Sequence, residues 1–141
     1  MKIYVGCALT HAPEEFRKKV AELKERLKKI PSVEVLEFLG LKAGDSRDVF
    51  VHDIINCVNE CDIMVAICDE PSTGLGIEMR EQVGRGKPLL AFGHSNTRIT
   101  RIILDPTWSS YRFYRYQDFN DIYETVRDAI LVGGYRFLML S

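Results

Sequence analysis

Short apolar runs alternate with amphipathic stretches along most of the chain. The apolar runs are bounded by turn residues, which is the pattern of buried strands. They lie at 2–8, 33–38, 63–68, 88–92 and 111–116. Between them, apolar residues recur three and four positions apart, which predicts helices. The helices are expected at 13–30, at 48–60, from the glycine-rich loop to 84–86, and at 118–132.

The first two predicted helices each carry one apolar face. In the first helix this face is formed by Phe16, Val20, Leu23, Leu27 and Ile30. In the second it is formed by Phe50, Ile54, Val58 and Cys61. The many charged residues of the first helix fall on its other side, so they are expected to face solvent.

The alternation of strands and helices predicts one α/β domain over 1–141. Its core would be a doubly wound, parallel, five-stranded sheet of the flavodoxin-like (Rossmann-like) type, with helices on both faces. Ligands of such folds bind beyond the carboxyl ends of the strands, where the strand order reverses. In the flavodoxin-like order this point lies between the first and third strands. The segments there are CALTHA, from Cys7, and CDEPSTGLGIE, from Cys68.

Composition narrows the classes of partner. The 141 residues are 46% hydrophobic, and 19 basic residues against 20 acidic ones give a net charge of −1. This balance disfavours binding to nucleic acid or to an anionic membrane. No apolar run approaches the length of about eighteen residues that a membrane span requires. A small-molecule ligand held in a local site is expected instead.

Four cysteines, none in CxxC spacing, predict free thiols in a reducing cytoplasm. Cys57 and Cys61 lie four apart on a predicted helix, but His52 is the only imidazole near them in sequence, so a metal site is disfavoured. The apolar tail AILVGGYRFLMLS is expected to pack on a second subunit.

The loop after the third strand carries the candidate chemistry. Gly74 and Gly76 allow a ligand to approach the backbone, and a helix that starts there offers free N–H groups. The loop lacks the third glycine of a dinucleotide fingerprint and the lysine of a Walker loop. Glu78 has two interpretations. It complements the helix dipole, which contributes about 0.3 to 1 kcal/mol, or the dipole holds it ionised as a nucleophile for the anomeric carbon of a sugar.

Two segments resemble the nucleoside 2'-deoxyribosyltransferase family, including its branch of nucleoside 5'-monophosphate N-glycosidases. They are IYVGCALT at the start and VNECDIMVAICDEPSTGLGIEMREQVGRGKPLLAF in the middle. The second is the more specific, because it joins an apolar strand, the pattern P-S-x-G-x-G-x-E, a helix and a G-K-P strand. The resemblance implies that Glu78 is the nucleophile that displaces the base from C1'. It also implies that Tyr4 lies beside Glu78 and orients it.

The resemblance assigns further residues to the substrate. Ser72 stands where the transferases tend to carry an aspartate that reads a free sugar hydroxyl, so a serine indicates a 5'-phosphate; a serine here also suits a helix cap. Arg98, in the loop GHSNTRIT, is either the phosphate contact of a neighbouring subunit's site or an exposed arginine without such a role. Substrate contacts are also expected from Leu9, Thr10, Asp69 and Gly74.

The general acid is the least certain position of the pattern. The family usually places an acid eight residues before the aspartate that introduces the third strand. Counting back from Asp62 gives Ile54, so Asp53 is offset by one residue, which is about 100° around an α-helix. Asp53 is the preferred acid, and Asp48 and Asp69 remain alternatives.

These observations predict a cytoplasmic enzyme that hydrolyses the N-glycosidic bond of (deoxy)nucleoside 5'-monophosphates through a covalent glycosyl-glutamate. No metal or organic cofactor is expected, and no nucleic-acid or membrane partner. A homodimer or higher homo-oligomer with shared sites is expected. Two alternatives stay open. One is a nucleoside 2'-deoxyribosyltransferase, in which a second base replaces water, and the other is a noncatalytic nucleotide-binding module, since a fold alone does not fix function.

Overall fold

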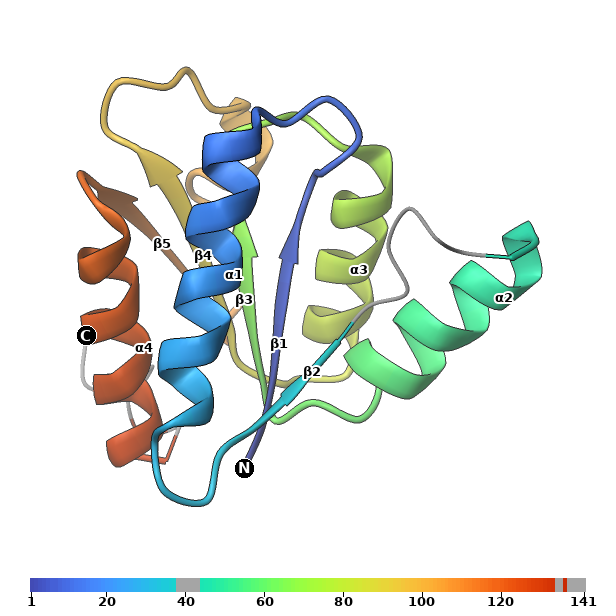
Figure 1. Ribbon diagram of the computed structural model, residues 1–141, viewed down its shortest axis with the longest axis horizontal. Coiled ribbons are helices and arrows are strands. Elements are labelled where there is room, and N and C mark those ends of the chain that lie inside the picture. The colour runs from blue at the N-terminus through green and yellow to red at the C-terminus, as the bar shows by residue number, and fades with distance from the viewer. Residues whose placement is uncertain (38–43, 134–135, 137–141) are drawn as a thin grey trace.

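The computed structural model describes residues 1–37, 44–133 and 136, and its centre is a five-stranded sheet (Figure 1). All neighbouring strands are parallel, in the order β2-β1-β3-β4-β5. The strands are β1 (Lys2–Cys7), β2 (Glu34–Leu36), β3 (Ile63–Ile67), β4 (Leu89–His94) and β5 (Tyr111–Tyr116). This order confirms the predicted doubly wound, flavodoxin-like sheet, and it places the reversal of strand order between β1 and β3.

Helices cover both faces of the sheet. They are α1 (Glu14–Lys28), α2 (Ser46–Phe50), the π-helix η2 (Val51–Val58), α3 (Thr73–Gly84), the 3₁₀-helix η3 (Arg101–Ile103) and α4 (Phe119–Leu131). α1 and α4 lie side by side on one face, whereas α3 and η2 pack on the other (Figure 1).

β1 shows how the core is divided between the two faces. Successive side chains of a strand point to opposite sides of the sheet. Ile3 and Val5 are fully buried among residues of α1 and α4, while Tyr4 is 1% exposed and packs with residues of α3 and η2. The alternation along β1 therefore turns the Tyr4 side chain toward α3. Because both faces are covered, every residue of β3 is buried and apolar.

The second predicted helix is in fact two helices of different type. α2 ends at Phe50, and η2 continues with wider turns, as shown by the 2.8 Å hydrogen bond from the Asn59 N–H to the Ile54 carbonyl five residues back. The expected apolar face is confirmed at Ile54, Val58 and Cys61, which are buried. It is wrong at Phe50, which is 55% exposed. The change of winding alters which residues share a face, so Phe50 turns away from the core.

The predicted apolar face of the first helix is confirmed. Val20, Leu23 and Leu27 are buried, and Phe16 and Ile30 pack against them at the edges of the core. Two other expectations lie at least partly outside the described residues. The end of the second predicted strand, at 38, is one, and most of the apolar tail, 134–135 and 137–141, is the other.

The four cysteines are free thiols. Across 1–37, 44–133 and 136, no helix has both the length and the apolar character to cross a membrane. In the same part of the chain, no group of three or more His, Cys, Asp or Glu side chains is arranged to hold a metal ion.

Gly6 allows α3 to come close to β1. A methyl group added at Gly6 would lie 3.0 Å from Leu75 Cδ1 and 3.1 Å from Met64 Cε, which is tighter than side chains normally pack. Leu75 belongs to the start of α3, and Tyr4 lies two residues before Gly6 on the same face of β1. The missing side chain at Gly6 therefore helps to set the distance between the strand that carries Tyr4 and the helix that carries Glu78.

Gly6→Ala is expected to lower the free energy of unfolding by about 1 to 3 kcal/mol, because the added methyl group must displace Leu75 or Met64 in a packed core. Urea unfolding followed by circular dichroism measures this change. Gly76→Ala is the matched control, since a methyl group there would meet nothing within 4 Å and alanine favours a helix. Equal effects of the two substitutions would contradict a tight contact at Gly6.

Candidate active site

Glu78 of α3 and Tyr4 of β1 meet where the helix packs on the sheet. Glu78 lies in the second turn of α3, near the buried Leu75 and Gln82 on the same side of the helix. The Tyr4 hydroxyl donates a hydrogen bond to the Glu78 carboxylate. The Oε2 atom of that carboxylate is buried and has no hydrogen-bond partner among the described residues. The protein thus holds the carboxylate in place through Tyr4 and leaves one oxygen unpaired.

Asp53 joins this pair from η2. The Asp53 side chain is 15% exposed, and its charge acts on both Glu78 and Tyr4. On a regular α-helix, the one-residue offset in the sequence would turn Asp53 away by about 100°. A π-helix takes up an extra residue in a wider turn. The winding of η2 therefore accounts for the offset and lets Asp53 lie near Glu78.

The ionisation of Glu78 is set by burial. Burial raises the pKa of Glu78 to about 7, the hydrogen bond from Tyr4 acts in the opposite direction, and the charge of Asp53 raises the pKa further. The expectation that the helix dipole keeps Glu78 ionised is wrong, because Glu78 lies beyond the first turn of α3, where the effect of the dipole has faded. Near neutral pH, Glu78 is therefore divided between its acid and carboxylate forms.

Tyr4 remains a hydrogen-bond donor throughout this range. Burial, together with the charge of the adjacent Glu78, raises the pKa of Tyr4 far above its ordinary value. The hydroxyl therefore stays protonated and keeps the orientation of the Glu78 carboxylate fixed.

Asp69, an alternative acid and a predicted substrate contact, is hydrogen-bonded to the carboxyl ends of β4 and β5. The Asp69 carboxylate accepts a hydrogen bond of 2.6 Å from the His94 backbone N–H and a second one from the Tyr116 hydroxyl. These bonds connect the loop after β3 to β4 and β5. Asp69 therefore has a structural task in the protein.

Asp48, the other alternative, caps a helix. Asp48 and Asp45 form a capping box at the start of α2, in which each side chain accepts a hydrogen bond from the backbone N–H of the other residue. Among the three candidate acids, Asp53 is the one whose charge acts on Glu78.

Ser72 caps the helix that carries Glu78. Its Oγ accepts a hydrogen bond of 3.1 Å from the Leu75 N–H, and Gly74 lies exposed in the same first turn. Ser72 also lines a pocket of about 380 Å³ between the start of α3 and η3. The other lining residues are Cys68, Glu70, Pro71, Thr73, Leu75, Gly76, Met79, Thr100, Ile102 and Ile103. Glu78 is not among them.

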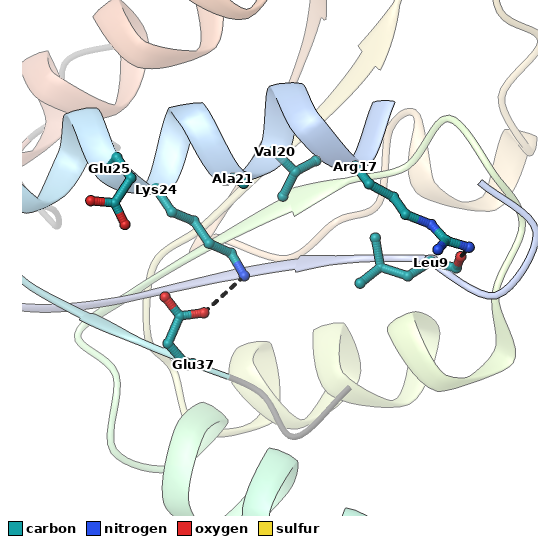
Figure 2. A pocket seen from close by; sticks show the side chains of 7 residues that line it. All are labelled: Leu9, Arg17, Val20, Ala21, Lys24, Glu25 and Glu37. Atoms are coloured by element: carbon teal, nitrogen blue, oxygen red, sulfur yellow. Dashed lines mark hydrogen bonds and ion pairs between the residues drawn. The ribbon is translucent and has the colours of Figure 1, made fainter. Parts of the chain in front are cut away.

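Leu9 lies at a second pocket, of about 230 Å³, between α1 and the chain that follows β2. Figure 2 shows Arg17 and Lys24 extending from α1 toward opposite ends of this pocket, where Leu9 and Glu37 lie. Arg17 donates a hydrogen bond of 2.9 Å to the Leu9 carbonyl, and the Lys24 ammonium lies 3.2 Å from the Glu37 carboxylate (Figure 2). The loop after β1, a predicted substrate contact, is thus anchored to α1.

Sequence similarity to a named protein shows which family the chain belongs to. A protein of Thermofilum pendens (strain DSM 2475 / Hrk 5), named "Putative 2'-deoxynucleoside 5'-phosphate N-hydrolase 1", is 30% identical over an alignment of 143 positions, which covers 95% of this chain and 97% of that protein. The chain belongs to the nucleoside 2'-deoxyribosyltransferase family. No family model matches it.

Two solved structures show that this member of the deoxyribosyltransferase family has the family's fold. The CMP N-glycosidase of Clostridium botulinum superposes with a TM-score of 0.66 at 19% identity, over 90% of this chain and 99% of that one. A 2-deoxyribosyltransferase from Leishmania mexicana superposes with a TM-score of 0.56 at 21% identity, over 65% of this chain and 63% of that one.

The sequence of this deoxyribosyltransferase-family chain predicted the three residues that meet where β1, η2 and α3 adjoin. They are Tyr4, Asp53 and Glu78. Two other predicted contacts, Thr10 and Arg98, are exposed on the loops after β1 and β4. The sequence reasoning missed His52 as a member of the site, although its ring Nδ1 lies 3.4 Å from Asp53 Oδ1. Its position directly before the preferred acid was the available signal.

Proposed function

We propose that the protein hydrolyses the N-glycosidic bond of (deoxy)nucleoside 5'-monophosphates and releases the free base and the sugar 5-phosphate. The Glu78 carboxylate carries this proposal, because Tyr4 orients it, Asp53 lies near it, and its Oε2 is buried with no partner among the described residues. A carboxylate in this setting is suited to attack a carbon that bears a leaving group. The name of the Thermofilum pendens relative supports a nucleotide as the substrate.

In the proposed reaction, the ionised Glu78 attacks C1' of the bound sugar. The bond from C1' to the base breaks as the bond to Glu78 forms, and Asp53 gives its proton to the departing base. Water then attacks C1', Asp53 accepts one proton of that water, and Glu78 leaves as a carboxylate. Both carboxyl groups return to their starting protonation.

The proposed reaction requires one negative charge and one proton on the Glu78–Asp53 pair. Two carboxyl groups that share a buried site favour one charge and one proton between them. When the proton rests on Asp53, Glu78 no longer feels a nearby negative charge, so it ionises more readily. We propose that this form, with Asp53 protonated and Glu78 ionised, is the reactive one.

The start of α3 is the proposed position for the 5'-phosphate. The N–H groups of a helix N-terminus attract anions, and the Ser72 hydroxyl can donate its proton to a phosphate oxygen while its oxygen caps the helix. An aspartate at this position would repel a phosphate dianion. Serine therefore favours the hydrolase over the alternative transferase.

Incubation with a panel of nucleosides and nucleoside 5'-monophosphates, followed by chromatography of the liberated base, tests this function. Release from monophosphates in preference to nucleosides is expected. Incorporation of an added free base into the product would identify the transferase instead. Absence of base release from every monophosphate would favour the noncatalytic nucleotide-binding module.

Ser72→Asp is expected to lower kcat/KM for monophosphates by about 10- to 100-fold, because a carboxylate within about 4 Å of the phosphate adds a like-charge repulsion. Release from nucleosides should change little. Aspartate is as good a helix cap as serine, so the fold should be preserved. Equal losses for both substrate types would contradict a phosphate contact at Ser72.

We also propose that the protein works in the cytoplasm as a homodimer or higher homo-oligomer with shared sites. Four free thiols are consistent with a reducing compartment. Exposed apolar side chains on the helices around the site, Phe50, Ile55 and Ile77, are consistent with a protein contact. Sedimentation equilibrium measures the assembly, and a monomer at all concentrations would contradict it.

A further inference from the structure

His52 adjoins Asp53 and is partly exposed to solvent. Its ring Nδ1 lies 3.4 Å from Asp53 Oδ1 and 3.7 Å from the Cys57 thiol. The His52 side chain is 36% exposed, whereas that of Asp53 is 15% exposed. The imidazole is therefore open to water on one side and adjoins the more buried acid on the other.

The π-helix creates this arrangement. In η2, residues five apart are stacked, and His52 and Cys57 are separated by five positions. The Cys57 thiol donates a hydrogen bond of 3.3 Å to the Glu37 carbonyl after β2. η2 is thus fixed to the chain that follows β2, and the His52 ring is held over Cys57 and beside Asp53.

We propose that His52 is a positioning residue for the reaction proposed above, acting through Asp53: its imidazolium pairs with the Asp53 carboxylate and exchanges a proton with it. This inference rests on the proposed function. An imidazole changes its charge between about pH 5 and 8, which suits such an exchange near neutrality.

The proton balance of this step is complete. Before base release, the imidazolium passes its Nδ1 proton to Asp53 Oδ1, which leaves the ring neutral and makes Asp53 the acid that then protonates the leaving base. When water hydrolyses the glycosyl-glutamate, Asp53 accepts a proton from that water. That proton then passes from Asp53 to the neutral His52 ring, which restores the starting imidazolium and carboxylate, so no proton is gained or lost over a turnover.

Several charged or titratable groups surround His52 and Asp53. Tyr4 lies on β1, Glu78 on α3 and Cys57 on η2, and Glu37 and Lys24 act on Cys57 from the chain after β2 and from α1. Glu78 and Glu37 add negative charge, and Lys24 adds positive charge. His52 is the group of this set whose ring lies against the Asp53 carboxylate, with Nδ1 3.4 Å from Oδ1.

Carboxyl ¹³C NMR titrations of wild type, His52→Gln and His11→Gln test the pairing without reference to activity. Removing the imidazolium should raise the pH at which the Asp53–Glu78 pair loses its first proton by at least about half a unit, because a nearby cation favours the carboxylate. His11 is exposed on the loop after β1, so His11→Gln should leave this pH unchanged. An unchanged titration in a folded His52→Gln protein would overturn the proposal.

The proton exchange is tested by base release from a monophosphate over a range of pH. His52→Gln should lower kcat about tenfold and leave KM within about twofold. This loss is smaller than the roughly 10²-fold or more that a direct proton-transfer group contributes, because His52 acts through Asp53. Imidazole added to the buffer should restore part of kcat. A loss of kcat without rescue by imidazole would indicate a merely structural role and overturn the exchange. If wild type releases no base, the proposed function fails, while the titration still decides whether His52 is paired with Asp53.

Discussion

Glu78→Gln is expected to reduce the release of base from nucleoside 5'-monophosphates by a factor on the order of 10³ or more, because the amide cannot form the covalent bond to C1'. Tyr4 can still donate a hydrogen bond to the amide oxygen, so the side chain should keep its place. Single-turnover assays with excess enzyme measure the rate of the chemical step. Mass spectrometry of the intact wild-type protein, quenched during turnover, should detect an added sugar phosphate.

Glu81→Gln is the matched control for this loss. Glu81 lies three residues further along α3 and is half-buried, so the same chemical change is made on the same helix. Base release by Glu81→Gln should stay within about twofold of wild type, as for a position outside the reacting groups. Unchanged release by Glu78→Gln would remove the covalent mechanism, whatever the control does.

The sequence predicted the fold well because the two structural periods are distinct in it. The segment at 111–116 was predicted as a strand and forms β5 over the same residues, and the alternation of strands and helices correctly predicted a parallel sheet. The winding of η2 could not be predicted. A π-helix depends on contacts made by the folded chain, here including the hydrogen bond from Cys57 to the carbonyl of Glu37.

The site shows the same division between local pattern and folded environment. Glu78 and Tyr4 were identified from segments of sequence, and alternation along β1 together with the turn of α3 brings them together. Asp53 remained one of three acids, because a residue count assumes an α-helix and only the three-dimensional structure includes the wider turn. The prediction that the helix dipole keeps Glu78 ionised was wrong for a related reason. A helix dipole can be inferred from local sequence, whereas burial is a property of the folded chain.

The burial of Glu78 has a cost for stability that depends on pH. Its pKa rises from the ordinary value of 4.5 to about 7 in the folded protein. Between these values the folded chain holds a proton that the unfolded chain has released, so the free energy of unfolding falls as the pH rises through this window. Below it, both states are protonated and no penalty exists; above it, the penalty is complete. The same side chain that the proposed reaction needs is therefore expected to destabilise the protein at alkaline pH.

Glu78→Gln should accordingly stabilise the protein at pH 8 by about 2 to 3 kcal/mol. Each unit of pKa shift corresponds to about 1.4 kcal/mol. Burial of the amide N–H₂ group offsets part of this gain in stability. At pH 4 the difference from wild type should be small or slightly unfavourable, because the carboxyl group is then neutral in both states. Urea unfolding of both proteins at several values between pH 4 and 8 measures the trend. Glu81→Gln should show no comparable dependence on pH. A stability difference between Glu78→Gln and wild type that is constant with pH would show that Glu78 titrates as it does in an unfolded chain, and it would remove the electrostatic basis for a shared proton between Glu78 and Asp53.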